Sequence, residues 1–141
     1  MDLLKQRVLQ AMNLTDDFYN HINDGCITLR ILDVPSNTIG EQAYCIIGAR
    51  ESYLKSLKIG HWVGFDCSLN DSKDKTLINS ILEETHANIE RFLRETSIDQ
   101  MNTSLLFDLL EHEVQHHGQL IRYAYANKID FPKSWNIRYT V

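Results

Sequence analysis

The sequence predicts an all-α fold, a four-helix bundle with a crossover connection and a short irregular C-terminal tail. Apolar residues recur every three or four positions along four segments of roughly twenty residues each. Only two prolines and six glycines occur in 141 residues, so strands separated by frequent turns are disfavoured. Four amphipathic helices of this length bury their apolar faces best around one core, so residues 1–141 are expected to form a single domain.

Two predicted helices lie in the first half of the chain. The first ends at Gly25, and its stripe is formed by Leu4, Val8, Ala11 or Met12, Thr15, Phe18 or Tyr19, and Ile22. The turn Pro35-Ser36-Asn37-Thr38 then supplies a candidate N-cap for a second helix, which ends near Ile59-Gly60. The apolar positions of the second helix are Ile39, Ala43, Ile46, Ile47, Leu54 and Leu57.

The second half of the chain contains a long loop, two more helices and the tail. The polar segment 61–75 is predicted to be a loop, and a loop of this length is often functional. The third helix covers 74–96, and Thr103 or Ser104 can cap the fourth. The tail 127–141 is expected to fold back across a bundle end or to add an edge strand. The inner stripe of the fourth helix is predicted to be Leu105, Leu109, His112, His116, Gln119 and Tyr123.

Composition and charge exclude several classes of protein. The formal net charge of -5 is the reverse of what phosphate-backbone binding needs, so nucleic acid is not an expected partner. The N-terminus has charged residues where a secretory signal is apolar, and no apolar run is long enough to span a membrane, which predicts a cytoplasmic location. Cys26, Cys45 and Cys67 are odd in number and widely spaced, which favours free thiols in a reducing compartment.

The most informative motif is the pair His112 and His116 in the fourth helix. Residues four apart rise from one helix face, so both imidazoles can bind one cation. Both also lie on the predicted buried stripe, where an unpaired polar group costs about 1–3 kcal/mol and therefore needs a hydrogen-bond partner or a metal. The letters from His112 to His116 also match HExxH, the zinc-hydrolase motif in which Glu113 would activate water, but no histidine follows downstream as a third ligand.

Three further residues of this segment and the chain end have open roles. Glu113 is expected to be a charge on the helix surface, with a catalytic base or a carboxylate that orients an imidazole as alternatives. His117 either contacts the site from outside the ligand set or is exposed. Trp135 either closes a pocket over the metal or caps the end of the core.

Together with its neighbours, the histidine motif resembles the fourth-helix signature of the DinB-like (DinB/YfiT) superfamily. The matching residues are His112, His116 and Gly118-Gln119, with His117 where that family commonly has Arg. The segment from Ser36 to Gln42, followed by Ile46-Ile47-Gly48-Ala49, looks like the helix that supplies the family's first ligand. The resemblance implies a metal-binding bundle, often a homodimer, with a divalent cation held by three histidines in an open-sided site.

The first ligand of the family falls on Cys45 in this sequence. A thiolate with two imidazoles would favour zinc or nickel, so a site formed by Cys45, His112 and His116 is predicted. The alternative is that Cys45 is only a small helix residue, because it lies away from the centre of the apolar stripe. His61 or water would then be the third ligand.

The resemblance also implies a function. Characterised relatives look like metal-dependent thiol transferases and isomerases, so a thiol S-transferase with a role in detoxification or stress response is expected. Its partners would be a small-molecule thiol and an electrophile. The alternatives are a non-enzymatic dimeric bundle with a degenerate metal site and, third, a zinc hydrolase.

Overall fold

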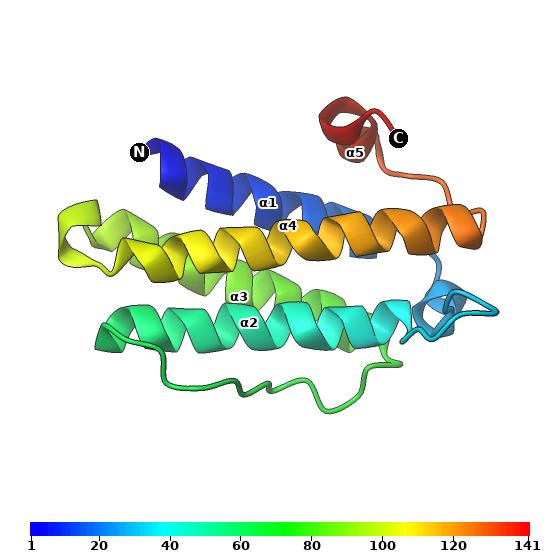
Figure 1. Ribbon diagram of the computed structural model, residues 1–141, viewed down its shortest axis with the longest axis horizontal. Helices are drawn as coiled ribbons and strands as arrows, with labels where there is room; N and C mark the ends of the chain where they lie inside the picture. The colour runs from blue at the N-terminus through cyan, green and yellow to red at the C-terminus, as the bar shows by residue number, and fades with distance from the viewer.

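The computed structural model describes residues 1–141 and is all-helical, as the sequence predicts (Figure 1). Its four long helices form a bundle: α1 (Leu3–His21), α2 (Ile39–Ile59), α3 (Lys75–Glu95) and α4 (Thr103–Ala126). Short 3-10 turns, η1 (Asp24–Thr28) and η2 (Ile98–Gln100), follow α1 and α3. None of the helices is long and apolar enough to cross a membrane.

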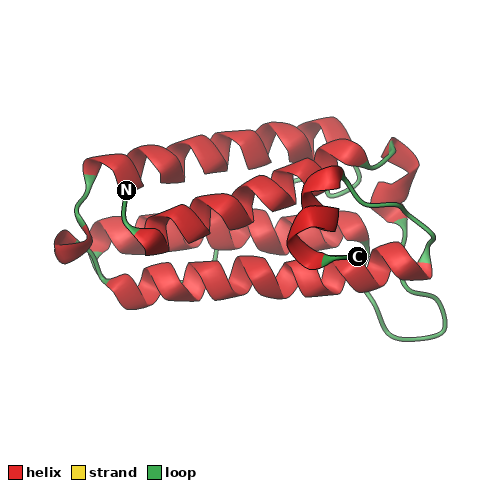
Figure 2. Ribbon diagram, turned by 90° about the horizontal axis from the view of Figure 1, so that it is seen from above, coloured by secondary structure: helices red, strands yellow, loops and turns green.

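The C-terminal tail forms a fifth helix, α5 (Lys133–Tyr139), so the expected edge strand and irregular tail are wrong. The spacing of its aromatic residues explains the helix, because Trp135 and Tyr139 are four apart and lie on one helix face. Trp135 is fully buried, and its Nε1–H donates to the carbonyl of Leu14, 2.6 Å away. Figure 2 shows α5 lying above α1 and α4.

Each long helix has two neighbours and one diagonal partner. The helices α1 and α2 both pack against α3 and α4, so α1 lies diagonally from α2. Figure 1 shows α1 and α4 running in one direction and α2 and α3 in the other. The segment 60–74 therefore returns along the length of α2 before α3 begins. Two glycines of α2 let this segment approach: a Cβ on Gly40 would lie 1.8 Å from the Ser72 carbonyl oxygen, and one on Gly48 would lie 2.2 Å from the Phe65 ring.

The predicted helix ends agree with the caps in the structure, with two differences. The first helix is predicted to end at Gly25, but α1 ends at His21 with Ile22 as its C-cap, and Gly25 lies inside η1. Thr38 and Glu41 form a capping box at the start of α2, and Gly60, with a φ of 106°, ends that helix. The Asp74 carboxylate caps α3. The cap of α4 is Asn102, whose side chain accepts from the backbone N–H of Ser104, so this helix begins one residue before the earliest predicted start.

The core consists of two apolar clusters along the bundle axis. The larger cluster includes Phe18, Ile46 and Trp135 and fills the end nearest α5 and η1. The smaller cluster, which includes Met12, Leu57 and Leu109, fills the opposite end. Buried polar side chains come from all four helices and lie near the boundary between the two clusters: Thr15, Arg50, Thr85, Glu113 and His117.

Candidate functional site

The imidazoles of His112 and His116 lie side by side on α4. Their ring centroids are 4.6 Å apart, with an angle of 54° between the ring planes. His116 is 8% exposed, and its Nδ1 is 2.5 Å from Oε1 of Gln42 on α2. His112 is half-buried, and its Nδ1 is buried without a hydrogen-bond partner. The protein therefore brings the two predicted ligands together and leaves one of their buried nitrogens unused.

Both imidazoles are neutral near pH 7, which is the form that binds a metal. Burial, followed by the neighbouring His112 ring, lowers the pKa of His116 to about 4. Burial also lowers the pKa of His112. Because the Gln42 oxygen only accepts, Nδ1 of His116 carries the proton that is donated to it, and Nε2 keeps a free lone pair. A hydrogen bond of this kind fixes the orientation of a metal-binding histidine.

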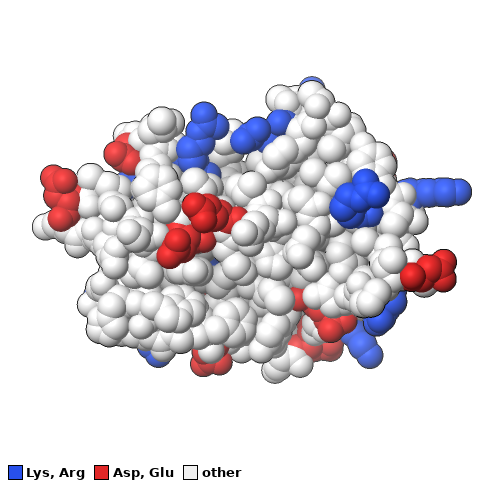
Figure 3. Space-filling model, viewed as in Figure 1, with Lys and Arg blue, Asp and Glu red and all other residues white.

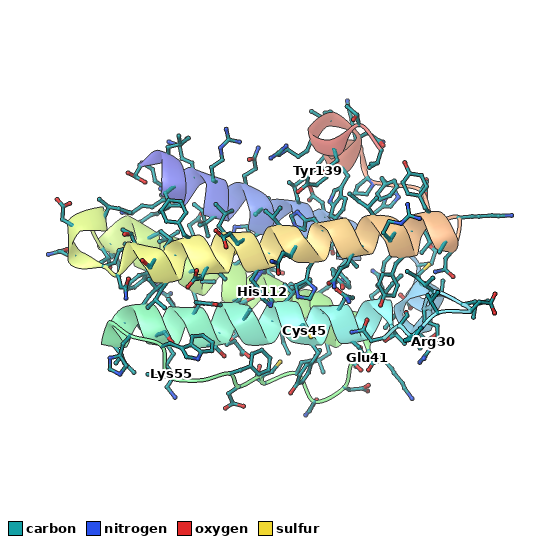
Figure 4. The ribbon with its side chains drawn as sticks, viewed as in Figure 1. Arg30, Glu41, Cys45, Lys55, His112 and Tyr139 are labelled. Carbon is teal, nitrogen blue, oxygen red and sulfur yellow. The ribbon has the colours of Figure 1, made fainter.

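Cys45 lies on α2 at the level of the two histidines. The antiparallel register of α2 and α4 is set by three contacts: Gln42 with His116, Arg50 with Glu113, and Gly60 with Asn102. Because the two helices run in opposite directions, moving from Gln42 to Cys45 on α2 corresponds to moving back about one turn on α4, from His116 to His112. Figure 4 shows Cys45 on α2 and His112 on α4 across the same interface.

The thiol of Cys45 is half-buried and protonated in this arrangement. Burial, followed by the nearby Glu41, raises its pKa. No three His, Cys, Asp or Glu side chains gather closely enough to hold a metal ion by themselves. The part of the predicted donor set that fits a cation is the pair of neutral imidazoles, one of which has a buried nitrogen without a partner. A metal would displace the thiol proton, as thiolate ligation requires.

The structure does not bring His61 to this site. His61 is exposed and follows Gly60, just beyond the C-terminal end of α2. Gln42, which contacts His116, lies in the first turn of the same helix. The 21 residues of α2 span about 30 Å, so His61 is far outside the reach of a ligand.

A buried ion pair lies next to the histidines, and it corrects the expectation that Glu113 is a surface charge. Glu113 is 1% exposed, and Arg50 is fully buried. Arg50 donates from Nε to Oε1 of Glu113 at 3.1 Å and from Nη2 to Oε2 at 2.6 Å. Burial raises the pKa of Glu113, but Arg50, His117 and Thr15 together lower it more, so the carboxylate is charged. Both oxygens of Glu113 are engaged with Arg50, so this carboxylate is not placed to activate water.

His117 joins this ion pair to α5. Its Nε2 is 2.7 Å from Oγ1 of Thr15, and its Nδ1 is 2.6 Å from the hydroxyl of Tyr139. The Thr15 hydroxyl donates to Glu113 at 2.6 Å, so it must accept from Nε2–H of His117. Nδ1 of His117 then accepts from the Tyr139 hydroxyl. Burial lowers the pKa of His117 to about 4, so the ring is neutral in this chain of hydrogen bonds.

Sequence reasoning missed Arg50 and Gln42 as parts of the site. Arg50 follows the apolar run Ile46-Ile47-Gly48-Ala49 and lies on the buried side of α2. This spacing is the feature of the sequence that could have predicted its burial. Gln42 is 4% exposed and lies one turn before Ile46 on the same side. A buried Arg or Gln side chain needs hydrogen-bond partners. The position of these two residues on the buried side of the helix therefore predicts polar contacts but does not identify the partners.

No protein-family model matches the chain, and no curated protein matches it. The likeness to the DinB-like superfamily therefore rests on the motifs in the sequence.

Proposed function

We propose that the chain binds a divalent metal ion, zinc or nickel, through His112 and His116 on α4 and Cys45 on α2. The observation that carries the proposal is the pair of neutral imidazoles 4.6 Å apart, of which His116 is buried and the half-buried His112 has a buried nitrogen without a partner. Two imidazoles and a thiolate suit these borderline-soft metals. Gln42 would orient His116 by accepting from its Nδ1–H.

We further propose a metal-dependent transfer of a small-molecule thiol to an electrophile. When bound, the metal lowers the pKa of a coordinated thiol and presents its sulfur as a nucleophile. His112 and His116 would hold the metal at the α2–α4 interface, with one coordination position open for the thiol. The support for this step is the resemblance of His112, His116 and Gly118-Gln119 to the superfamily signature. The acidic net charge of -5 does not favour a nucleic-acid substrate.

The hydrolase alternative receives no support from the position of Glu113. A zinc hydrolase of the HExxH type needs this carboxylate free beside the metal to take a proton from water. Here Arg50 holds both of its oxygens, and Thr15 donates to one of them. The non-enzymatic bundle, in which Cys45 does not bind metal, is the alternative that the experiment below separates from the proposal.

The first experiment measures metal content by elemental analysis of the untagged protein after dialysis. About one equivalent of zinc or nickel per chain is expected, with loss in His116→Ala and weakening in Cys45→Ala. Cys45→His, which restores the three-histidine set implied by the resemblance, is expected to retain or strengthen binding. Matched controls are Cys26→Ala, a half-buried cysteine elsewhere, and His21→Ala, an exposed histidine; both should keep the metal.

The second experiment tests catalysis in the metal-loaded protein. A panel of low-molecular-weight thiols is offered to 1-chloro-2,4-dinitrobenzene, in which the thiol sulfur displaces chloride and the thiol proton passes to solvent. Turnover that requires both the metal and His116 supports the transferase. Bound metal without thiol turnover would show that the protein binds a metal but is not a thiol transferase. Absence of metal in every variant except Cys45→His would show that the metal site is degenerate.

A further inference from the structure

A hollow lies between α1, α4 and α5, and neither His112 nor His116 lines it. Its volume is about 650 Å³, within the range of small-molecule sites. Its apolar lining comes from Ala11 and Leu14 on α1 and from Leu110 and Val114 on α4. Figure 4 shows Tyr139, which also lines the hollow, on the side of α5 that faces the bundle.

Two arginines without carboxylate partners border this hollow. Arg7 donates from Nη1 to Oε1 of Gln10 at 3.1 Å and forms no ion pair, and Arg138 lies over the Tyr139 ring at 5.1 Å. The ion pairs of the chain involve neither of them. Figure 3 shows basic side chains gathered at the upper edge of the molecule, where α5 meets α1. Two uncompensated guanidinium groups are notable in a chain of net charge -5.

The surrounding polar groups define where a charged ligand would lie. Glu111 on α4 is the acidic residue of the hollow. Arg7 and Arg138 also border an adjoining, more polar hollow, which contains Asp17 and Ser134. The hydroxyl oxygen of Ser134 is buried without a hydrogen-bond partner. Each hollow therefore has one acidic residue, Glu111 or Asp17, and an anion is attracted only at the arginines.

We propose that this hollow binds a small organic anion with an apolar body, such as a medium-chain carboxylate. The carboxylate lies between Arg7 and Arg138, because guanidinium groups bind carboxylates through paired N–H donors. The alkyl chain covers Leu110 and Val114, whose burial supplies the apolar part of the affinity. Glu111 repels the anionic end from α4 and so fixes the orientation. This site is independent of the metal site on the α2 side of α4.

The test is titration of the purified full chain with decanoate, with decyltrimethylammonium as the matched cation. Isothermal titration calorimetry is expected to show saturable binding of one decanoate per chain and much weaker binding of the cation. Arg7→Gln and Arg138→Gln should each weaken decanoate binding by about tenfold, the typical loss for one charge-assisted hydrogen bond. Arg91→Gln, on the exposed side of α3, is the matched control and should bind decanoate like the parent chain.

Two further measurements keep the proposal falsifiable if an arginine variant is poorly folded. Val114→Trp fills the hollow from a partly exposed position and should abolish binding while the chain remains helical by circular dichroism. The chain has two tryptophans, so the indole NMR signal of Trp135, whose ring is 5.4 Å from that of Tyr139, should shift on binding while that of Trp62 should not. Equal binding of cation and anion, or unchanged binding in both arginine variants, would overturn the proposal. A change of oligomeric state in Val114→Trp without decanoate binding to the parent would instead identify the face as an interface between two copies.

Discussion

Arg50 is the side chain at which all four long helices meet. From α2 it donates to Glu113 on α4, to the carbonyl of Met12 and the carboxylate of Asp16 on α1, and to the carbonyl of Leu82 on α3. Burial lowers the pKa of Arg50, but Glu113 and Asp16 raise it more, so the guanidinium keeps its charge. A buried ion pair of this kind contributes little net stability, but removing one partner leaves an uncompensated buried charge.

Arg50→Ala is therefore expected to destabilise the fold by about 3–5 kcal/mol, because Glu113 would be left charged and buried. Replacing both partners, in Arg50→Leu with Glu113→Leu, should cost much less than the sum of the single changes. Urea unfolding followed by circular dichroism measures Arg50→Ala, the two single leucine variants and the double variant. A double variant as unstable as the two single variants added together would show that Arg50 and Glu113 are not energetically coupled, and would contradict the prediction.

His117 should make stability depend on pH. The unfolded chain binds a proton at this residue near pH 6.5, whereas the folded chain binds it only near pH 4. As the pH falls through this window, the unfolded state gains a proton that the folded state does not, so stability decreases. The loss from this residue between about pH 7.5 and about pH 5 is about 2 kcal/mol. His117→Gln should remove this part of the pH dependence of the urea midpoint and leave the part that comes from His116, whose pKa is also lowered to about 4. The exposed His61→Gln is the control, and an unchanged slope in His117→Gln would contradict the assignment.

At the scale of elements, the helices follow the apolar spacing except where polar residues take buried positions. The predicted stripe of α4 included Gln119, which is exposed, and omitted Glu113, His117 and Leu120, which are buried. The error has a physical cause: charged and polar residues count against burial until their partners are known. Those partners lie on other helices, so the spacing within α4 did not contain them. The prediction for the tail was wrong for a related reason. Trp135 is buried against α1, and the sequence of the tail alone does not contain that contact.

Two glycines in helices should respond oppositely to alanine. Alanine favours a helix over glycine by about 1 kcal/mol, so Gly118→Ala on α4, where a Cβ meets nothing within 4 Å, should stabilise the chain by up to that amount. Gly40→Ala on α2 would place a Cβ 1.8 Å from the Ser72 carbonyl oxygen and should destabilise it by about 1–3 kcal/mol. Thermal unfolding of both variants measures the difference, and stabilisation by Gly40→Ala would show that the segment 60–74 moves away freely.

At the scale of the whole molecule, the helical bundle was predictable from the sequence, but its polar contacts were only partly so. Four apolar stripes and their caps gave the four long helices. The pair His112 and His116 was visible because both residues lie in one helix. Arg50 and Glu113, by contrast, are 63 residues apart in sequence, and nothing local pairs them. Contacts within a helix can be read from spacing, whereas contacts between helices depend on a register that only the folded molecule supplies.

The position of the proposed metal between α2 and α4 predicts a coupling between metal binding and stability of the entire bundle. A ligand that binds only the folded state at a free concentration 100 times its Kd adds about 2.7 kcal/mol, which corresponds to a rise in Tm of about 10 °C for a chain of this size. Saturating zinc or nickel should therefore raise the Tm, and a chelator should reverse the rise. His112→Ala and His116→Ala should each remove the effect, while His21→Ala should retain it. If the metals shift the Tm equally in all three variants, they bind elsewhere on the chain, and the α2–α4 interface is held by Gln42, Arg50 and Glu113 without an ion.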